Sequence, residues 1–358
     1  MEKDRVWWVT RYRDTALLLK SEDVPLLEPV EWLGRISARL GGAFPNLILL
    51  LGGSYPFQNG AAHLAARAVL KETIGAATRA WTADAVAALA AKLIAPFADG
   101  REFDAAREIA RAMPQTILAG TLGTTPAHVQ TMSMLSRTVS EVWHHLTPPL
   151  KELHALEAAA SREVALLRET HGEERSAAFA SIAFLALAGV DSTSGLIGSL
   201  IHLLAEQPAL QDRLRENPHL IADVVNETLR LWPPLRRIVG RRTRSEVALA
   251  DAVLPREAVL VIDLERAHRD ADAFAEPDRF LPERKGPPSL VFGFGAHACL
   301  GAALARLEAR VLVETLLRDF VVVSAGNALR ATSPDWNEFA RLPVRLTRRM
   351  LANPRPIA

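Results

Sequence analysis

The residue best suited to chemistry is Cys299, the one cysteine in a chain of 358 residues. It lies in a glycine-rich segment that reads Phe292-Gly293-Phe294-Gly295-Ala296-His297-Ala298-Cys299-Leu300-Gly301. Two glycines two residues apart permit a tight turn that can direct backbone amides at a sulfur atom. The apolar spacing after Cys299 predicts a helix over about 300–318, whose positive dipole end favours a thiolate. Gly301 leaves room for a flat cofactor close to the backbone. The segment therefore suits a thiolate that binds iron and stays protected.

Two simpler interpretations of Cys299 are open when it is taken alone. It could be an ordinary buried thiol beside a plain glycine loop. It could also be a catalytic nucleophile, although His297 is too close in sequence to be the usual partner of such a cysteine. A single cysteine excludes an intrachain disulfide and any zinc or iron–sulfur site that needs two cysteines of one protomer. This cysteine usage fits a reducing, cytoplasmic setting.

Taken as a whole, the segment around Cys299 resembles the cysteine-ligand loop of the cytochrome P450 family. The matching residues are Phe292, Gly293, Gly295, His297, Cys299, Leu300, Gly301, Leu304 and Ala305. The resemblance implies haem b as cofactor, O2 as co-substrate, Cys299 as the proximal iron ligand, and Phe292 and Gly301 among the cofactor-binding residues. It also implies a mainly α fold with a small β region, in which a long central helix lies over the haem and a C-terminal helix follows the cysteine loop.

A second candidate segment, Ala188–Thr193, lies midway along an apolar stretch that predicts a helix over about 176–206. By itself it indicates a kink or a packing site, since Gly, Ser and Thr weaken helices. The resemblance implies instead the distal oxygen-binding groove. There Gly189 would open room beside the iron, and Asp191 with Ser192 or Thr193 would relay protons. Ser192 stands where the family usually has threonine, so the hydroxyl is kept in altered form.

Cationic residues form a third set. His63 and Arg67 lie one turn apart on a helix predicted over about 61–78, and a solvated helix face explains them equally well when they are taken alone. The resemblance implies that both hold haem propionates, together with His297 and Arg241, or Arg242 as the alternative to Arg241. Cations are required at that end of a haem, because two carboxylates would otherwise be buried unpaired.

Glu227 and Arg230 are three residues apart on a helix predicted over about 218–231, so they can pair on one helix face. Such pairs usually lie on a solvated surface. The resemblance implies a buried pair that locks a third residue from the loop before the cysteine, and Arg284 is the candidate for this residue. Buried charges persist only when they are fully partnered. The role expected for these three residues is structural.

The elements that must position these groups are mainly helical. Apolar periodicity predicts further helices over about 83–97, with Thr82 as N-cap, 105–121, 126–145 and 148–170, and Pro208 suits the first position of another. Candidate strands lie at Val247–Leu249, Val259–Ile262, Phe320–Val323 and Val344–Leu346. We expect one haem-thiolate domain over residues 1–358. Because Trp7–Tyr12 resembles a segment well inside the family's domain, the usual N-terminal helix and first strand are expected to be absent. The link between the helices ending near 170 and starting near 176 is unusually short.

Composition narrows the class of protein. The 42 Lys and Arg residues nearly balance 41 Asp and Glu residues, which argues against bulk binding of nucleic acid. Residues 177–205 could be mistaken for a membrane span, but Asp191 near its centre would cost about 2.5–3.5 kcal/mol on insertion scales. We therefore expect a buried helix there, no membrane span or anchor, and a cytoplasmic location.

The leading functional hypothesis is a monooxygenase that inserts oxygen from O2 into a small, largely apolar molecule, as in bacterial specialised metabolism. No flavin or iron–sulfur segment is present, so electrons would come from a separate ferredoxin-type donor with its reductase. Basic residues such as Arg67, Lys71 and Arg306 could steer an acidic partner. Two alternatives stay open. One is a haem-thiolate peroxygenase, dehydratase or isomerase without a redox chain, and the other is a non-catalytic haem-binding partner subunit.

Overall fold

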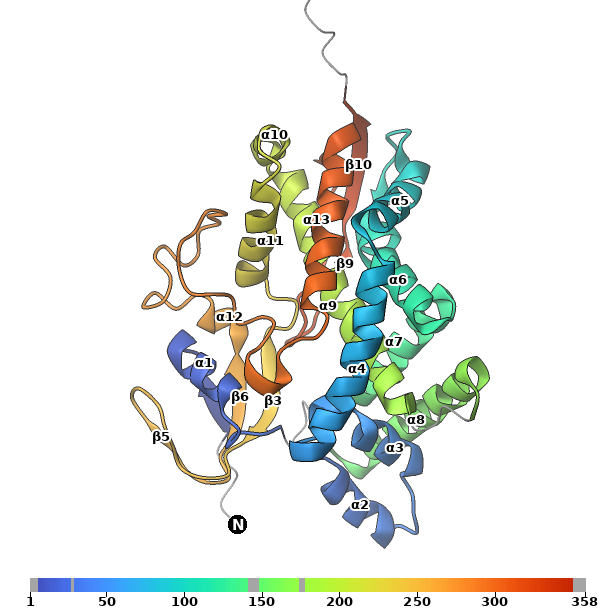
Figure 1. The fold of residues 1–358 in the computed structure, drawn as a ribbon, viewed down its shortest axis with the longest axis vertical. Coiled ribbons are helices and arrows are strands. Elements are labelled where there is room, and N and C mark those ends of the chain that lie inside the picture. Colours follow the sequence, from blue (N-terminus) through green and yellow to red (C-terminus); the bar gives the residue numbers. More distant parts are fainter. Residues whose placement is uncertain (1–5, 27–28, 141–147, 174–177, 350–358) are drawn as a thin grey trace, which may run out of the picture.

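The computed structural model describes residues 6–26, 29–140, 148–173 and 178–349. Its centre is the 28-residue helix α9 (Phe179–Glu206), in which 21 residues are buried. In Figure 1, α9 runs behind α13 (Ala302–Asp319) through the middle of the molecule, with the sheet of β3 and β6 on one side and α7 and α8 on the other. The mainly helical fold with a small β region that the sequence predicts is confirmed.

The other helices follow in chain order. They are α1 (Tyr12–Lys20), α2 (Pro29–Arg39), α3 (Pro45–Gly53), η1 (Tyr55–Phe57), α4 (Gly60–Ala80), α5 (Ala83–Ile94), η2 (Ala95–Phe97), η3 (Ala106–Arg111), α6 (Ala112–Leu122), α7 (Pro126–Ser140), α8 (Leu150–His171), α10 (Pro208–Glu216), α11 (Leu220–Leu231), α12 (Leu264–Ala267) and η6 (Gly295–His297). The predictions that Thr82 caps a helix and that Pro208 begins one are both confirmed: Thr82 Oγ1 accepts a hydrogen bond from the Ala85 amide at 3.3 Å. The predicted extension of α7 over 141–145 lies outside the described residues.

Two three-stranded sheets complete the framework. The first has the order β1 (Val6–Val9), β6 (Val259–Asp263), β3 (Arg237–Arg242), and the second has the order β2 (Phe103–Asp104), β10 (Pro343–Arg348), β7 (Phe320–Ser324). Two short hairpins pair β4 (Val247–Ala248) with β5 (Val253–Leu254) and β8 (Leu329–Arg330) with β9 (Phe339–Arg341). All four predicted strands are therefore present. The strand β1, which pairs in parallel with β6, was not predicted.

A bulge in β3 positions one candidate site residue. The register with β6 shifts between Val239 and Arg241, and Gly240 between them has a φ of 84°. Positive φ is accessible to glycine at little cost, and an extra residue in one strand changes the face on which the following side chain lies. Arg241 is accordingly buried, at 3% exposure, whereas Arg242 is half-buried.

The apolar core has two main parts, and α9 belongs to both. The C-terminal half of α9 packs with α5, α11, α13 and the second sheet, and its N-terminal half packs with α2, α3, α7 and α8. A smaller apolar cluster lies between α4, α9 and the cysteine loop, and it contains Tyr55, Leu185 and Leu300. This cluster marks the region where the sequence predicts a cofactor.

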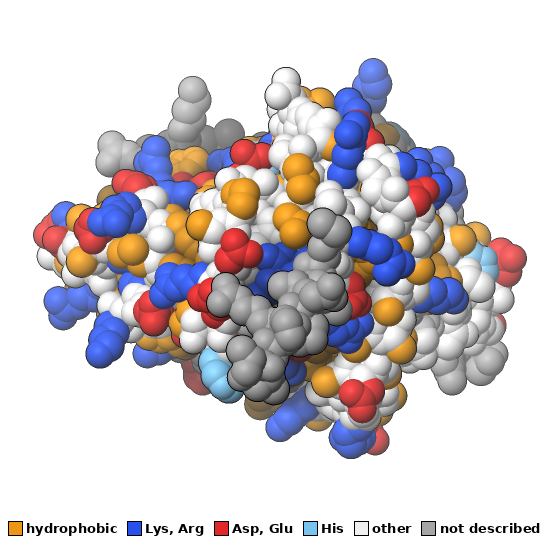
Figure 2. All heavy atoms as spheres, turned by 90° about the horizontal axis from the view of Figure 1, so that it is seen from above, with side chains coloured by type: hydrophobic (Ala, Val, Ile, Leu, Met, Phe, Trp, Pro, Cys, Tyr) orange, Lys and Arg blue, Asp and Glu red, His pale blue; other side chains and the backbone are white. Residues whose placement is uncertain are grey.

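Within the described residues, α9 is long and apolar enough to cross a membrane, and 67% of its most apolar window is buried in the protein. A second span would qualify only if α4 and the segment Ala83–Phe97, which are bent by 72° relative to each other, were counted as one. The predicted buried central helix is thus confirmed. Figure 2 shows acidic and basic side chains interspersed over the face seen from above, in line with the balanced charge.

Candidate functional site

The cysteine loop holds Cys299 at the amino-terminal end of α13. Gly293 and Gly295 have φ values of 64° and 68°, and these turns bring the Cys299 amide within 2.7 Å of the Phe292 carbonyl oxygen, to which it donates. The amides of Gly301 and Ala302 hydrogen-bond to the Cys299 sulfur. These two donors follow the cysteine at the start of α13, whereas the two-glycine turn was expected to supply them from before it.

Opposing effects act on the pKa of the Cys299 thiol. Burial raises the pKa of the Cys299 thiol, while the Gly301 amide, the guanidinium groups of Arg306 and Arg67, and the Ala302 amide lower it. The side chain is nevertheless solvent-accessible, and a Cβ at Gly301 would approach the sulfur to 4.0 Å. An accessible sulfur beside amides and cations can bind a metal ion as a thiolate, because the metal itself favours the deprotonated form.

Four groups from three parts of the chain converge beside this loop. The rings of His63 and His297 are 4.0 Å apart between centroids. Burial lowers the pKa of His297 to about 4, and the nearby His63, Arg241 and Arg67 lower it further. The Arg241 guanidinium donates to the carbonyl oxygen of Val24 at 2.7 Å. The structure thus brings together all four residues that the resemblance assigns to the propionates.

This cluster of four residues lacks acidic partners in the part of the chain that the structure describes. Across the described ranges, none of these four residues forms an ion pair with a carboxylate, and His63 Nε2, His297 Nδ1 and Arg241 Nε are buried without a hydrogen-bond partner. Arg242, the alternative to Arg241, pairs instead with Glu257 at 3.2 Å. Unpartnered donors in a buried place are costly, so the cluster fits a ligand that carries carboxylates.

On α9, Asp191 is buried at 1% exposure and points toward η3 and α7. Its Oδ1 accepts hydrogen bonds from Arg111 at 2.8 and 2.9 Å and from the Ser133 hydroxyl at 3.1 Å. Arg137 lies 3.8 Å from Oδ2 and pairs with Glu338 at 2.7 Å. Burial raises the pKa of Asp191, against the lowering effect of Arg111 and Arg137. No sequence pattern indicates these partners, which come from distant segments.

The neighbouring candidates on α9 lie differently. The Ser192 hydroxyl donates to the Ala188 carbonyl oxygen at 2.6 Å, and its side chain is half-buried. Thr193 is buried. A Cβ at Gly189 would meet the Leu118 side chain at 3.6 Å, which is an ordinary contact. The hydroxyl of Ser192 and the carboxylate of Asp191 therefore have different partners although they are adjacent in sequence.

The expected structural triad is present. Arg230 makes two hydrogen bonds of 2.8 Å to Glu227, and Arg284 Nε donates to Glu227 Oε1 at 3.1 Å. The Leu281 amide donates to the same oxygen at 3.0 Å. Burial alone would raise the pKa of Glu227, but these hydrogen bonds outweigh it and hold the pKa below its usual value. The triad ties α11 to the long loop that precedes the cysteine.

Tyr55 of η1 also belongs to this region, although it was not predicted as a site residue. Its ring stacks on that of His63 at 4.9 Å between centroids and lies 6.0 Å from the ring of Phe184 on α9. Its hydroxyl oxygen accepts a hydrogen bond of 2.6 Å from Arg67. Tyr55 thus lies between α9 and the cysteine loop, which face each other in this region. No local sequence pattern indicates this position, because the partners of Tyr55 belong to other elements.

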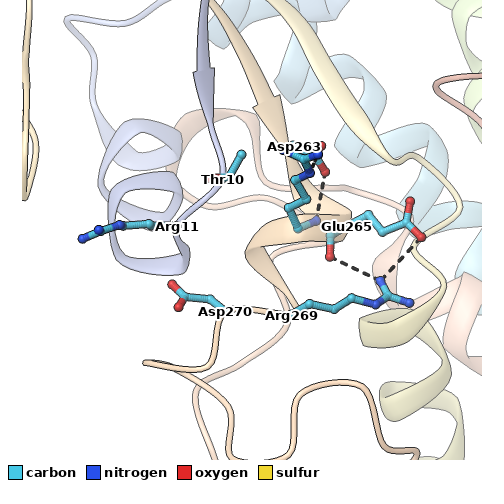
Figure 3. Close-up of a pocket in the computed structure, with 7 residues that line it drawn as sticks. Thr10, Arg11, Asp263, Glu265, Arg269 and Asp270 are labelled. Carbon is cyan, nitrogen blue, oxygen red and sulfur yellow. Dashed lines mark hydrogen bonds and ion pairs between the residues drawn. The ribbon is translucent and has the colours of Figure 1, made fainter.

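Two surface hollows adjoin each other where β1 and β6 end and β3 begins, and they share Asp263, Glu265 and Arg266. Figure 3 shows the first of them, where Arg269 pairs with Glu265 at 3.5 Å. Neither hollow includes Cys299 or any other candidate site residue. The described ranges also contain no group of three or more His, Cys, Asp or Glu side chains that could hold a metal ion. The cysteine loop is therefore the better-supported candidate site.

Comparisons with known proteins agree with this geometry. The family model described as Cytochrome P450 matches residues 173–346. The chain is 34% identical over 247 residues to the erythromycin C-12 hydroxylase of Saccharopolyspora erythraea, covering 62% of each protein, and 36% identical over 167 residues to cytochrome P450 109 of Bacillus spizizenii, covering 46% of this chain and 41% of the relative. It spans less than two thirds of the length of either relative.

Solved structures show the same fold. The structure of CalO2 superposes with a TM-score of 0.79 at 24% identity and covers 96% of this chain and 91% of its own. Epothilone D-bound cytochrome P450epoK superposes with a TM-score of 0.80 at 21% identity, covering 97% and 92%. At these identities the likeness concerns the fold alone. It extends over helices and sheets that the family model does not reach.

Proposed function

Because the chain belongs to the cytochrome P450 family, whose cofactor is haem b, we propose that it is a haem-thiolate monooxygenase that inserts oxygen from O2 into a small, largely apolar organic molecule. One observation carries this proposal. An accessible cysteine sulfur at the start of α13 lies beside four converging groups, His63, Arg67, Arg241 and His297, that have no acidic partner among the described residues. A haem would supply partners for both: an iron for the sulfur, and two propionate carboxylates for the four groups.

The residues present fit a haem. Cys299 would be the iron ligand, with Phe292 and Gly301 beside the cofactor, and the four groups of the cluster would hold the propionates. When bound, haem supplies the O2 chemistry, and a thiolate ligand favours cleavage of the O–O bond. The buried triad of Glu227, Arg230 and Arg284 supports this arrangement indirectly, because it fixes the loop that leads to the cysteine.

Proton delivery is proposed for Asp191 and Ser192, with Thr193 beside them. Arg111 and Ser133 hold Oδ1 of Asp191, whereas the buried Oδ2 has no hydrogen-bond partner in the described chain and lies 3.8 Å from Arg137. Oδ2 would therefore be the oxygen that takes and releases the proton. The Ser192 hydroxyl is oriented by the Ala188 carbonyl oxygen, and its own oxygen can still accept a hydrogen bond. Gly189 lies beside this pair and would leave space at the oxygen-binding side.

The substrate class and the electron donors are proposed from residues near the cysteine loop and from the names of relatives. Phe184 and Leu185 of α9 border the region opposite the cysteine loop, which favours an apolar substrate. Relatives named erythromycin C-12 hydroxylase and vitamin D(3) 25-hydroxylase also suggest a hydroxylation of bacterial specialised metabolism. Electrons would come from a separate ferredoxin-type protein with its reductase, in the cytoplasm. Lys71 and Arg306 are exposed and would attract an acidic partner, whereas Arg67 donates to the Ala298 carbonyl oxygen.

An optical experiment tests the proposal. Purified protein loaded with haem, then reduced and exposed to carbon monoxide, should show the absorbance of a thiolate-ligated ferrous carbonyl. Cys299→Ala should lose both this absorbance and turnover, since it removes the iron ligand. Full turnover in this variant, or histidine-type absorbance in the wild type, would refute the assignment. Turnover with peroxide but not with ferredoxin, reductase and NAD(P)H would favour a peroxygenase.

A further inference from the structure

Tyr55 lies beside the residues that we assign to the haem propionates. The side chain is 7% exposed, stacks on His63, and has its ring centroid 6.1 Å from that of His297. Arg67 donates to its hydroxyl oxygen at 2.6 Å and to the Ala298 carbonyl oxygen at 2.9 Å through the same nitrogen. Tyr55 therefore contacts three of the four residues that we assign to the propionates.

The hydroxyl of Tyr55 has an unused donor. A phenol oxygen that accepts a hydrogen bond keeps its own hydrogen available. Among the described residues the structure records no acceptor for that hydrogen, although the side chain is buried. Burial raises the pKa of Tyr55 more than the neighbouring Arg67 lowers it, so the phenol keeps its hydrogen at neutral pH. A buried hydroxyl with a free hydrogen, set among cations, is poised to meet an anionic oxygen.

We propose that Tyr55 is a further cofactor-binding residue, whose hydroxyl donates to a propionate carboxylate of the haem while its oxygen accepts from Arg67. The proposal rests on the proposed function, because it requires haem at this site. A phenylalanine would pack equally well against His63 and Phe184, so packing alone does not explain the hydroxyl. The pair of Arg67 and Tyr55 would give the carboxylate one charged and one neutral donor.

The test measures loss of haem to an excess of a scavenging apoprotein such as apomyoglobin. Tyr55→Phe should lose haem about tenfold faster than wild type or more, since a hydrogen bond to a charged group is removed. Tyr12→Phe is the matched control: Tyr12 is the other tyrosine of the chain, and its hydroxyl donates to the Pro288 carbonyl oxygen at 2.7 Å. Tyr12→Phe should lose haem at the wild-type rate, with the thiolate–carbonyl spectrum unchanged in both variants.

Two further measurements separate contact from packing. With haem dimethyl ester, which has no carboxylate, Tyr55→Phe and wild type should lose the cofactor at the same rate. The resonance Raman band of propionate bending should shift in Tyr55→Phe and not in Tyr12→Phe. An unshifted band, equal loss rates for the two variants, or an acceleration that persists with the diester would overturn the assignment of Tyr55. A wild type that binds no haem would instead overturn the proposed function.

Discussion

A carboxyl group buried between three helices is expected to be protonated in the folded protein, which makes the stability of the fold depend on pH. Glu163 of α8 is fully buried, and its Oε1 makes a short hydrogen-bond contact with the Ser136 hydroxyl of α7. The same hydroxyl lies 2.9 Å from the Ala183 carbonyl oxygen of α9. One hydroxyl hydrogen cannot serve two acceptors. We therefore expect Glu163 to be protonated and to donate to Ser136, which in turn donates to Ala183.

The size of the effect follows from the pKa. Burial raises the pKa of Glu163 from 4.5 to about 8, opposed only in part by Ser136. The folded protein then binds one more proton than the unfolded chain between these two pH values, so stability falls as pH rises from about 4.5 to about 8. The loss is roughly 3 kcal/mol at pH 7 and roughly 5 kcal/mol above pH 8. Below pH 4.5 there is no loss.

Glu163→Gln tests this reasoning, because an amide has the shape of the protonated acid and can donate to Ser136 in the same way. Urea unfolding of the haem-loaded proteins at pH 5, 7 and 9 should show the variant close to wild type at pH 5 and more stable by several kcal/mol at pH 9. Glu169→Gln, an exposed position of the same helix, should show no such divergence. A Glu163→Gln difference that is constant with pH would mean that the acid titrates normally and that the proton count is wrong.

The structure predicts how three other substitutions affect the free energy of unfolding. Glu227→Gln leaves the buried guanidinium groups of Arg230 and Arg284 without their counter-charge and should cost about 3–5 kcal/mol in denaturant unfolding; an unchanged midpoint would contradict a buried triad. Gly295→Ala places a Cβ at a φ of 68° and 3.4 Å from the Lys20 Cα, so it should cost roughly 1–2 kcal/mol and weaken haem retention. Thr82→Ala removes the N-cap of α5 and should cost about 1 kcal/mol with haem retention unchanged, which makes it the control for Gly295→Ala.

The cysteine loop and its cationic neighbours could be predicted from the sequence because each has a local signature. The two glycines before Cys299 and the helix after it are contiguous. The helix expected over about 300–318 is observed as α13, Ala302–Asp319. The triad of Glu227, Arg230 and Arg284 was also foreseeable, since the i, i+3 spacing indicates a pair and the resemblance supplied the third member. In these cases the relevant contacts are encoded within a short segment or a family motif.

The features that escaped prediction arise from pairings between distant segments. The strand β1 forms because Val6–Val9 pairs with β6, more than 250 residues later, and four apolar residues alone do not specify a strand. The partners of Asp191 come from η3 and α7, at sequence separations of 80 and 58 residues for Arg111 and Ser133. Nothing in the local sequence indicates that these side chains meet. Tyr55 was missed for the same reason, since its partners belong to α4, α9 and the cysteine loop.

The surroundings of Asp191 connect the buried helix to the outside of the protein. The side chains of Arg111, Arg137 and Glu338 are 25%, 22% and 16% exposed, whereas that of Asp191 is fully buried. Arg137 is shared between the two acids, so a change in the charge of Glu338 alters how strongly Arg137 attracts Asp191 Oδ2. The side chains of Arg111 and Arg137 thus lie between water at their exposed parts and Asp191, the acid proposed to pass protons to Ser192. Because the cations around Asp191 are partly exposed, protons would reach this acid from their side, without solvent entering the apolar side of α9.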